Sequence, residues 1–291
     1  MSIFPSCFAL ETTTRCNASC SFCMRRRIKR GHGEMSVELF DKIMRQLPEG
    51  SWVVPHIWNE PLEDTRFWDL MNLVPSCCSV LLYTNGSLVA GDSLQGLSTH
   101  PLVKRIYVSF NGWDKESYES SMFGLDFDVT VANVLALVSL ERENKSEVHL
   151  SVIVPREKQS SEVYGLLDKI FPMRLFSTCA IYNPFQIRSG TEDPNPRNLA
   201  CSRPFFYMSI LWDGRVCLCC DDYDGEEILG DLNRDTVESV WFSPRMIEIR
   251  RAHLIGRVKD IAVCRNCDEP PRCQHHMGVY RDHFSDVLEA M

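Results

Sequence analysis

The sequence lacks any long apolar run and any excess of positive charge. No window approaches the roughly 18 consecutive apolar residues that a membrane-spanning helix needs, so we expect no membrane association. The first residues, MSIFPSCFALETT, have neither a basic beginning nor a sustained apolar stretch, so we expect no secretory signal and a cytoplasmic protein. The net charge of -8 argues against general nucleic-acid binding.

Cysteine, in contrast, is abundant. Of the 14 cysteines, three lie within residues 16–23 and seven within residues 201–273. In a reducing compartment, clustered cysteines bind metal or carry out chemistry more often than they form disulfides. The sequence therefore predicts two metal-binding or reactive sites, one near each end of the chain.

Apolar segments alternate with amphipathic ones over the first two thirds of the chain. Segments typical of strands are 7–13, 52–58, 79–86, 103–112, 147–155 and 178–183. Segments with helical spacing between them are 36–47, 66–74, 128–143 and 161–171. Because parallel strands need such crossovers, we expect an α/β fold with a six-stranded parallel sheet. Its functional loops should follow the carboxyl ends of the strands.

The pattern changes after residue 182. Residues 183–200 contain three prolines and several turn formers, and we interpret them as a linker. Beyond the linker, residues 204–220 predict a hairpin turning at Asp213 and Gly214, and residues 235–254 predict one or two short helices.

Three regions follow from this pattern: a first domain of residues 1–182, the linker of residues 183–200, and a small C-terminal domain of residues 201–291. The last region is too small to form a stable core of its own without a cross-link such as a bound metal. Its cysteines can supply that cross-link.

The first cysteine group has the spacing C-x-x-x-C-x-x-C, formed by Cys16, Cys20 and Cys23. Zinc sites usually show paired C-x-x-C units and close with four ligands, whereas this loop supplies three thiolates. Three cysteines that hold a cubane iron–sulfur cluster leave one iron open to another ligand. The pattern therefore favours an iron–sulfur site on the rim of the sheet.

This spacing, directly after a first parallel strand, resembles the signature of the radical S-adenosylmethionine enzymes. The resemblance implies a partial (β/α)6 barrel and a 4Fe–4S cluster held by Cys16, Cys20 and Cys23. The open iron would bind S-adenosylmethionine, and one electron would cleave its carbon–sulfur bond. The resulting deoxyadenosyl radical would abstract a hydrogen atom from an unactivated carbon.

Four further matches extend the resemblance to contacts with S-adenosylmethionine. Phe22 takes the family's aromatic position near the adenine, and WNEPL at 58–62 resembles its Gly-Glu-Pro motif with Asn59 in place of glycine. VSFNG at 108–112 and SVIVPRE at 151–157 resemble the strand ends that meet the ribose or carboxylate and cover the adenine. The implied cofactor-binding residues are Phe22, Asn59, Glu60, Pro61, Ser109, Asn111, Ile153 and Arg156.

The second cysteine group resembles the auxiliary SPASM or twitch domain of radical enzymes. The spacing around Gly214 and the stretch LGDLNRDTVESVW both match that domain. The resemblance implies a second 4Fe–4S cluster closed by four thiolates, and an all-thiolate zinc site is the alternative. The implied ligands are Cys201, Cys219, Cys264 and Cys267.

Cys217, Cys219 and Cys220 compete for the second ligand position, and the spacing from Gly214 in the resembling domain selects Cys219. Cys217 and Cys219 are expected to share a strand face, with Cys220 on the opposite one. Cys273 has the distance from Cys267 that a two-cluster domain uses, but position 277 is a methionine. We therefore expect one auxiliary cluster.

The layout is similar to that of deoxy-scyllo-inosamine dehydrogenases, which have an immediate N-terminal cluster and one auxiliary cluster. A closed auxiliary cluster suits electron acceptance from a substrate radical, which gives a two-electron oxidation. The leading hypothesis is therefore an oxidoreductase acting on a polar small molecule, such as an aminocyclitol, sugar or nucleoside, in natural-product biosynthesis.

Three alternatives stay open. An epimerase would need a cysteine as hydrogen donor, and the candidates are Cys179, Cys217, Cys220 and Cys273. The others are a maturase of ribosomal peptides and a non-catalytic iron–sulfur or zinc protein. The basic run RRRIKR at 25–30 is either a docking patch for a flavodoxin- or ferredoxin-type electron donor or plain solvated surface.

Overall fold

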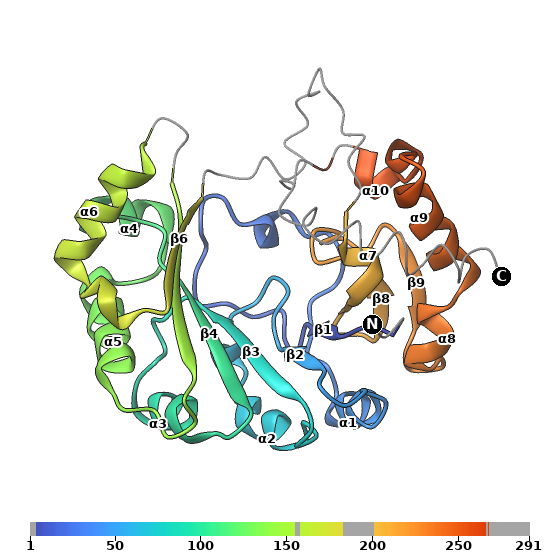
Figure 1. Ribbon diagram of the computed structural model, residues 1–291, viewed down its shortest axis with the longest axis horizontal. Helices are drawn as coiled ribbons and strands as arrows, with labels where there is room; N and C mark the ends of the chain where they lie inside the picture. The colour runs from blue at the N-terminus through green and yellow to red at the C-terminus, as the bar shows by residue number, and fades with distance from the viewer. Residues whose placement is uncertain (1–3, 155–157, 183–200, 266, 268–291) are drawn as a thin grey trace.

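The computed structural model describes residues 4–154, 158–182, 201–265 and 267 of the chain. Within these residues, one nine-stranded sheet has the order β6-β5-β4-β3-β2-β1-β7-β8-β9. The first six strands are parallel to one another and form a curved, open barrel (Figure 1). They are β1 (Cys7–Leu10), β2 (Trp52–Val54), β3 (Ser79–Thr84), β4 (Val103–Ser109), β5 (Glu147–Ile153) and β6 (Thr178–Tyr182). The expected α/β fold with six parallel strands is confirmed.

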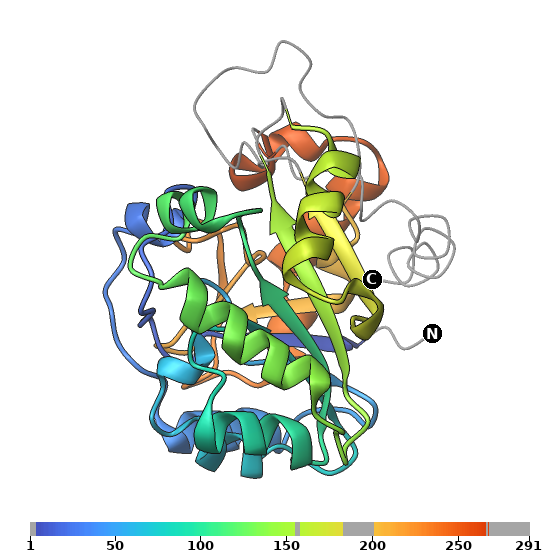
Figure 2. The ribbon, with the colours of Figure 1, turned by 90° about the vertical axis from the view of Figure 1, so that its left-hand side faces the viewer.

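Helices cover the outer face of this sheet, as Figures 1 and 2 show. They are α1 (Val37–Met44), α2 (Phe67–Asn72), α3 (Gly91–Thr99), α4 (Lys115–Ser121), α5 (Phe127–Ser139) and α6 (Ser160–Ile170). Strand residues alternate between the two faces: Val80 and Leu82 belong to the core beneath the helices, and Leu81 and Tyr83 to a second cluster opposite. We call the face turned away from these helices the concave face.

The apolar pattern predicts α1, α2, α5 and α6 but not α3 or α4. α3 contains two glycines, and α4 has the almost wholly polar sequence KESYESS. A capping box between Asp114 and Ser117 starts α4. Such local hydrogen bonds stabilise a helix without the apolar spacing that the sequence search relied on. Short 3-10 helices complete this region: η1 (Met24–Arg27), η2 (Pro61–Glu63) and η3 (Met173–Leu175).

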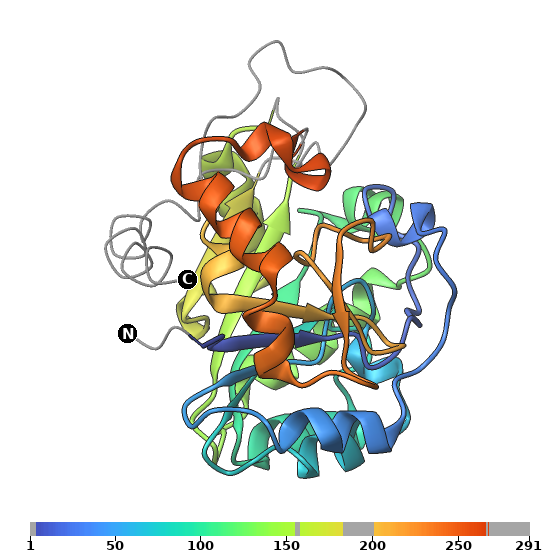
Figure 3. The same ribbon diagram turned by 90° about the vertical axis from the view of Figure 1, so that its right-hand side faces the viewer.

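The C-terminal region extends the barrel sheet. β7 (Tyr207–Ile210) pairs in parallel with β1, and β8 (Arg215–Cys217) and β9 (Ile228–Asp231) continue antiparallel from it. The hairpin predicted at Asp213 and Gly214 is confirmed, and Gly214 has the positive φ of 90° that favours glycine. The orange and red helices in Figure 3 lie beside this end of the sheet. The helical elements here are α7 (Arg203–Phe206), α8 (Val237–Trp241), α9 (Pro244–Leu254), η4 (Val258–Asp260) and α10 (Ala262–Arg265).

This end of the sheet shares the core of the barrel. Trp241 and Ile249 belong to the same buried apolar cluster as Phe8 and Leu10 of β1. The C-terminal region is therefore stabilised by the barrel as well as by anything its cysteines bind. The predicted linker, residues 183–200, lies outside the described residues. Among the described residues, none of the helices has the length and apolar character needed to traverse a bilayer.

Candidate active site

The cysteine loop after β1 is held in place by the ends of neighbouring strands. The Asn17 amide nitrogen donates to Ser87 Oγ at 2.8 Å, and its Oδ1 accepts from Asn85 Nδ2 at 2.8 Å. Both partners follow β3. Further along the loop, the Ser21 N–H donates to the carbonyl of Ser121 at 2.9 Å. The loop is thus positioned at the carboxyl ends of the strands, where the sequence predicts it.

The three thiols of this loop lie near enough to influence one another's ionisation. Burial raises the pKa of Cys16 to about 11 and of Cys20 to about 12, and it also raises the pKa of Cys23. Negative charge on Cys23 would raise the pKa of each of the other two further, whereas Arg25 lowers the pKa of Cys16 and Cys23. Three partly buried thiolates are unfavourable together without a positive centre. The donor set therefore fits an iron–sulfur cluster, which supplies that centre.

The turn at the WNEPL motif is held by hydrogen bonds from one of its own side chains. Asn59 Oδ1 accepts the Ile57 N–H at 3.0 Å, and Asn59 Nδ2 donates to the Pro55 carbonyl at 3.3 Å. The asparagine therefore stabilises this turn where the family motif has glycine. Pro61 begins η2, and its preceding residue, Glu60, donates its backbone N–H to the Arg15 carbonyl at 2.9 Å.

Glu60 uses its carboxylate to hold the end of β3. It accepts from Thr84 Oγ1 at 2.8 Å and from the Asn85 N–H at 2.7 Å. Burial raises its pKa to about 7, and these hydrogen bonds oppose that rise. The side chain is therefore a structural link between the loop after β2 and the end of β3.

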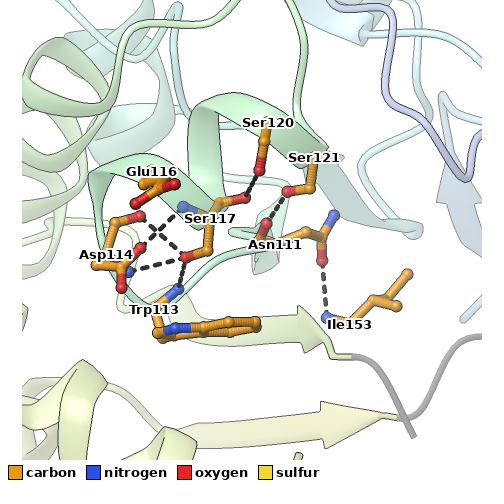
Figure 4. Close-up of a pocket in the computed structure, with 8 residues that line it drawn as sticks. All are labelled: Asn111, Trp113, Asp114, Glu116, Ser117, Ser120, Ser121 and Ile153. Carbon is orange, nitrogen blue, oxygen red and sulfur yellow. Dashed lines mark hydrogen bonds between the residues drawn. The ribbon is translucent and has the colours of Figure 1, made fainter.

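A cavity of about 370 Å³ lies beyond the carboxyl ends of β4 and β5 (Figure 4). Asn111 Oδ1 accepts the Ile153 N–H at 2.8 Å and so joins these two strand ends. Ser121 ties the cavity to the cysteine loop, because its carbonyl accepts from Ser21. The lining residues are Asn111, Trp113, Asp114, Glu116, Ser117, Ser120, Ser121 and Ile153. Two predicted cofactor-binding residues, Asn111 and Ile153, thus meet at one cavity next to the cysteine loop.

The other described residues predicted to bind S-adenosylmethionine do not line this cavity. Ser109 pairs with Ser151 and does not line this cavity. Phe22 is 37% exposed on the cysteine loop, which leaves its ring accessible. Arg156 lies outside the described residues.

Cys179 lies on the wrong face of β6 for hydrogen donation into the barrel. It pairs with Leu150, and both pack in the core between the sheet and the helices. Its neighbour Thr178 pairs with His149, whose Nδ1 lies 2.8 Å from Thr178 Oγ1. Residues alternate along a strand, so the face that suits Thr178 excludes Cys179. The proposed catalytic role of Cys179 is therefore not supported by its position.

The second cysteine group is connected through side chains of the C-terminal helices. The Cys201 N–H donates to His253 Nδ1 at 3.0 Å, and Cys264 Sγ lies 3.7 Å from His253 Nε2. The Cys267 N–H donates to the Cys264 carbonyl at 3.2 Å. Cys219 has Cys267 among the charges that raise its pKa, together with burial. Contacts through His253 and Cys267 therefore connect all four predicted auxiliary ligands.

The expectation that Cys217 and Cys219 share a strand face, with Cys220 on the opposite one, is wrong. β8 ends at Cys217, so the alternation of a strand does not continue to the next cysteines. Cys217 and Cys220 both belong to the apolar cluster on the concave face, whereas Cys219 turns towards Cys267. This arrangement favours Cys219 as the ligand. Cys273 lies outside the described residues.

A dense set of hydrogen bonds joins the cysteine loop to the auxiliary segment. Arg30 Nη2 contacts Glu11 Oε1 at 2.5 Å, and Arg30 Nε donates to the Tyr223 carbonyl at 2.6 Å. The Lys29 N–H donates to Asp224 Oδ1 at 2.6 Å. Arg30 is thus a buried link between the two cysteine groups, and Lys29, although exposed, is held to the same segment through its backbone. Among the arginines of the run, only Arg26 and Arg27 are exposed.

Two family models match the chain. The model described as the radical SAM superfamily matches residues 10–165, more than half of the chain. The chain belongs to the radical SAM superfamily. A second model, SPASM, described as an iron-sulfur cluster-binding domain, matches residues 201–268. The resemblance inferred from the cysteine spacings is confirmed. The radical SAM domain implies S-adenosylmethionine and a 4Fe–4S cluster as cofactors, and the SPASM domain implies auxiliary iron–sulfur binding.

The chain is also similar to individual proteins. The chain is 26% identical over 248 residues to the tungsten-containing aldehyde ferredoxin oxidoreductase cofactor-modifying protein of Pyrococcus furiosus, covering 72% of this chain and 69% of the relative. It is similar in structure to BtrN in complex with AdoMet and 2-DOIA, with a TM-score of 0.63, 17% identity, and coverage of 92% and 95% of the two chains.

Two further solved structures share the fold. AnSMEcpe with bound AdoMet has a TM-score of 0.67 at 14% identity, covering 98% of this chain and 100% of that one. SuiB of Streptococcus suis bound to the precursor peptide SuiA has a TM-score of 0.67 at 13% identity, covering 85% and 67%. At such identities the likeness shows the fold of the radical SAM chain and nothing about its substrate.

Sequence reasoning missed several residues that organise the site. Asn17 lies within the cysteine motif and Asn85 within the turn YTNG, so their positions were visible but their pairing was not. Trp58, next to the Glu-Pro motif, donates its indole N–H to the Cys220 carbonyl at 2.6 Å. His253 gave no signal, because a single histidine in an amphipathic helix is usually structural.

Proposed function

We propose that the protein is a radical SAM oxidoreductase that oxidises a polar small molecule, such as an aminocyclitol, sugar or nucleoside, in natural-product biosynthesis. Cys16, Cys20 and Cys23 would hold the first cluster, and Cys201, Cys219, Cys264 and Cys267 one auxiliary cluster. When bound, these groups supply the electron that cleaves S-adenosylmethionine and an acceptor for the electron that the substrate loses.

One observation supports a polar substrate most directly. Four rings form a row on the concave face. Tyr83 stacks on Tyr107 and Tyr107 on His149, with centroids 5.0 Å and 4.4 Å apart, and His56 lies tilted against Tyr83 at 5.4 Å. The row crosses β3 to β5 and begins in the loop after β2 that also carries Trp58. Imidazole and phenol groups along such a surface suit a ligand rich in hydroxyl or amino groups.

We assign the role of proton acceptor in this row to His56. Its ring makes no hydrogen bond within the described residues, and burial lowers its pKa to about 4. The imidazole is therefore neutral near pH 7 and retains an acceptor nitrogen. In an oxidation, the carbinol carbon loses a hydrogen atom, its hydroxyl loses a proton to His56, and one electron leaves, which completes the carbonyl group.

Anaerobic reconstitution tests the proposal. A chain that holds about eight irons, forms 5′-deoxyadenosine and converts an aminocyclitol or sugar to a product two mass units lighter supports it. About four irons with zinc, or no 5′-deoxyadenosine, contradicts it. Mass-neutral conversion with deuterium taken up from solvent contradicts the oxidation and points to epimerisation.

Epimerisation is the second candidate, because another thiol reaches the concave face. Cys220 packs in the same cluster as Tyr83 and Tyr207, and it adjoins the loop of Trp58. An epimerase would use this thiol to return a hydrogen atom to the opposite side of the substrate carbon. Cys220→Ala would then abolish deuterium uptake while 5′-deoxyadenosine formation continued.

The relatives are compatible with small-molecule chemistry without deciding it. The Pyrococcus furiosus protein is named for modifying a cofactor, and BtrN was crystallised with 2-DOIA. SuiB was crystallised with a precursor peptide. Peptides are therefore tested as substrates in the same assay. A peptide product with no turnover of aminocyclitols, sugars or nucleosides would overturn the substrate class.

A further inference from the structure

A buried histidine links two of the auxiliary cysteines. His253 is 1% exposed and lies on α9 between the segments that carry Cys201 and Cys264. Its Nδ1 is 3.0 Å from the backbone nitrogen of Cys201, and its Nε2 is 3.7 Å from Cys264 Sγ. One ring therefore contacts a backbone amide at one side and a thiol at the other.

The contact with Cys201 decides where the ring carries its proton. A backbone N–H can only donate, so Nδ1 must present its lone pair. The proton of the neutral ring then sits on Nε2, which faces Cys264 Sγ. The geometry thus gives an N–H···S hydrogen bond in which the sulfur is the acceptor.

A second buried side chain fixes the orientation of α9. Arg250, one helical turn before His253, donates from Nε to the Pro204 carbonyl and from Nη1 to the Trp241 carbonyl, each at 2.8 Å. Its guanidinium also lies 4.1 Å from the centre of the Trp241 ring. α9 is thereby locked to α7 and α8, and His253 has little freedom to turn away from the cysteines.

We propose that His253 is a positioning residue that raises the reduction potential of the auxiliary cluster by hydrogen bonding to the thiolate of Cys264. The proposal rests on the assignment of Cys201 and Cys264 as ligands. A cluster gains negative charge on reduction, and an N–H donor at a ligand sulfur stabilises that charge. The higher potential would favour electron acceptance from a substrate radical.

Two amide substitutions at His253 test the roles of the two ring nitrogens separately. In His253→Asn the amide oxygen takes the position of Nδ1 and keeps the Cys201 N–H, but no donor reaches Cys264. In His253→Gln the amide nitrogen takes the position of Nε2 and keeps a donor near the sulfur. His32→Asn, at an exposed histidine, is the matched control.

The measurement is an anaerobic redox titration of the reconstituted full chain, followed by electron paramagnetic resonance. We expect a more negative auxiliary potential in His253→Asn, a much smaller shift in His253→Gln, and none in His32→Asn. Proton electron–nuclear double resonance should also show an exchangeable proton coupled to the reduced auxiliary cluster, lost in His253→Asn. The potential of the first cluster should stay unchanged throughout.

Two results would overturn the inference. One is an unchanged potential in both variants at wild-type iron content, and the other is an equal shift in both, which would indicate packing rather than a hydrogen bond. Loss of auxiliary iron in His253→Asn but not in His253→Gln would still support the donor. These readouts need no substrate, so they do not depend on the oxidation. A wild-type chain with about four irons would instead overturn the ligand assignment itself.

Discussion

The indole N–H of Trp58 donates a hydrogen bond of 2.6 Å to the backbone carbonyl of Cys220, 162 residues further along the chain. Trp58 directly precedes Asn59 of the Glu-Pro motif, and Cys220 directly follows Cys219 of the auxiliary group. The Trp58 ring also meets Tyr223 edge-on, with centroids 6.5 Å apart. The turn beside the predicted S-adenosylmethionine site therefore fixes the segment that carries an auxiliary ligand.

Trp58→Phe should weaken this link while leaving an aromatic ring in place. The Cys220 carbonyl loses its donor, and such a loss costs about 1 to 3 kcal/mol when the group stays buried. We expect lower stability in urea and a larger share of 5′-deoxyadenosine formed without product. Trp52→Phe, at the other end of β2, is the control and should keep the wild-type ratio. An unchanged ratio in Trp58→Phe would show that the bond does not couple the two sites.

The Glu11–Arg30 pair is a second link, and it is buried on both sides, with side chains 0% and 3% exposed. Burial raises the pKa of Glu11, and the hydrogen bond from Arg30 opposes the rise. Removing one partner leaves the other buried and uncompensated, which typically costs about 3 to 5 kcal/mol. We therefore expect Arg30→Met to be strongly destabilised in urea unfolding.

The double variant Glu11→Gln/Arg30→Met tests whether charge is the cause. Without either charge, most of the loss should be recovered, because no unpaired ion remains in the interior. Additive losses in the two single variants and the double variant would mean that packing, and not the ion pair, holds the cysteine loop to the auxiliary segment.

The structure also shows which parts of this site a sequence can reveal. Cys16, Cys20 and Cys23 lie within eight residues, so their spacing is a local pattern. Asn111 and Ile153 were implied by the resemblance of VSFNG and SVIVPRE to strand ends of the family, and each motif is again a local pattern. The link between Trp58 and Cys220 depends on β7 joining β1, a pairing that no local pattern announces.

The predictions for Cys179 and Cys219 both depended on the direction in which a side chain leaves a strand. Cys179 was proposed from residue type alone, but its face is set by its register with Leu150. The face of Cys219 was predicted by extending a strand that in fact ends at Cys217. Alternation gives the direction of a side chain only when the bounds and pairing of its strand are known.

Arg26 and Arg27 are the exposed arginines of the basic run, beside the cysteine loop. If they guide an acidic electron donor, Arg26→Glu/Arg27→Glu should slow cluster reduction by flavodoxin about 10-fold at low salt and leave reduction by dithionite unchanged. Lys104→Glu/Arg174→Glu makes the same charge change elsewhere and is the control. Stopped-flow absorbance measures both rates, and equal slowing with both reductants would reject the docking patch.

Glu60 should make stability depend on pH. Burial raises its pKa from 4.5 to about 7, so the folded chain holds this proton more tightly than the unfolded chain does. Stability then falls as pH rises from about 4.5 to about 7, by about 3 kcal/mol. Glu60→Gln removes this dependence, and Glu49→Gln, at an exposed position, should keep it. Anaerobic urea unfolding near pH 5 and near pH 8 measures the difference, and parallel profiles for Glu60→Gln and wild type would contradict it.

His56 provides the test of the proposed proton transfer. With no acceptor at this position, His56→Phe should lower ketone formation about 100- to 10,000-fold, while 5′-deoxyadenosine continues to form. The base is active when unprotonated, and its pKa of about 4 keeps it so throughout the range from pH 5 to pH 8. Product formation should therefore show no decline near the ordinary histidine value of 6.5. A decline centred there, or full product yield from His56→Phe, would assign the proton to another group, and His32→Phe should behave as wild type.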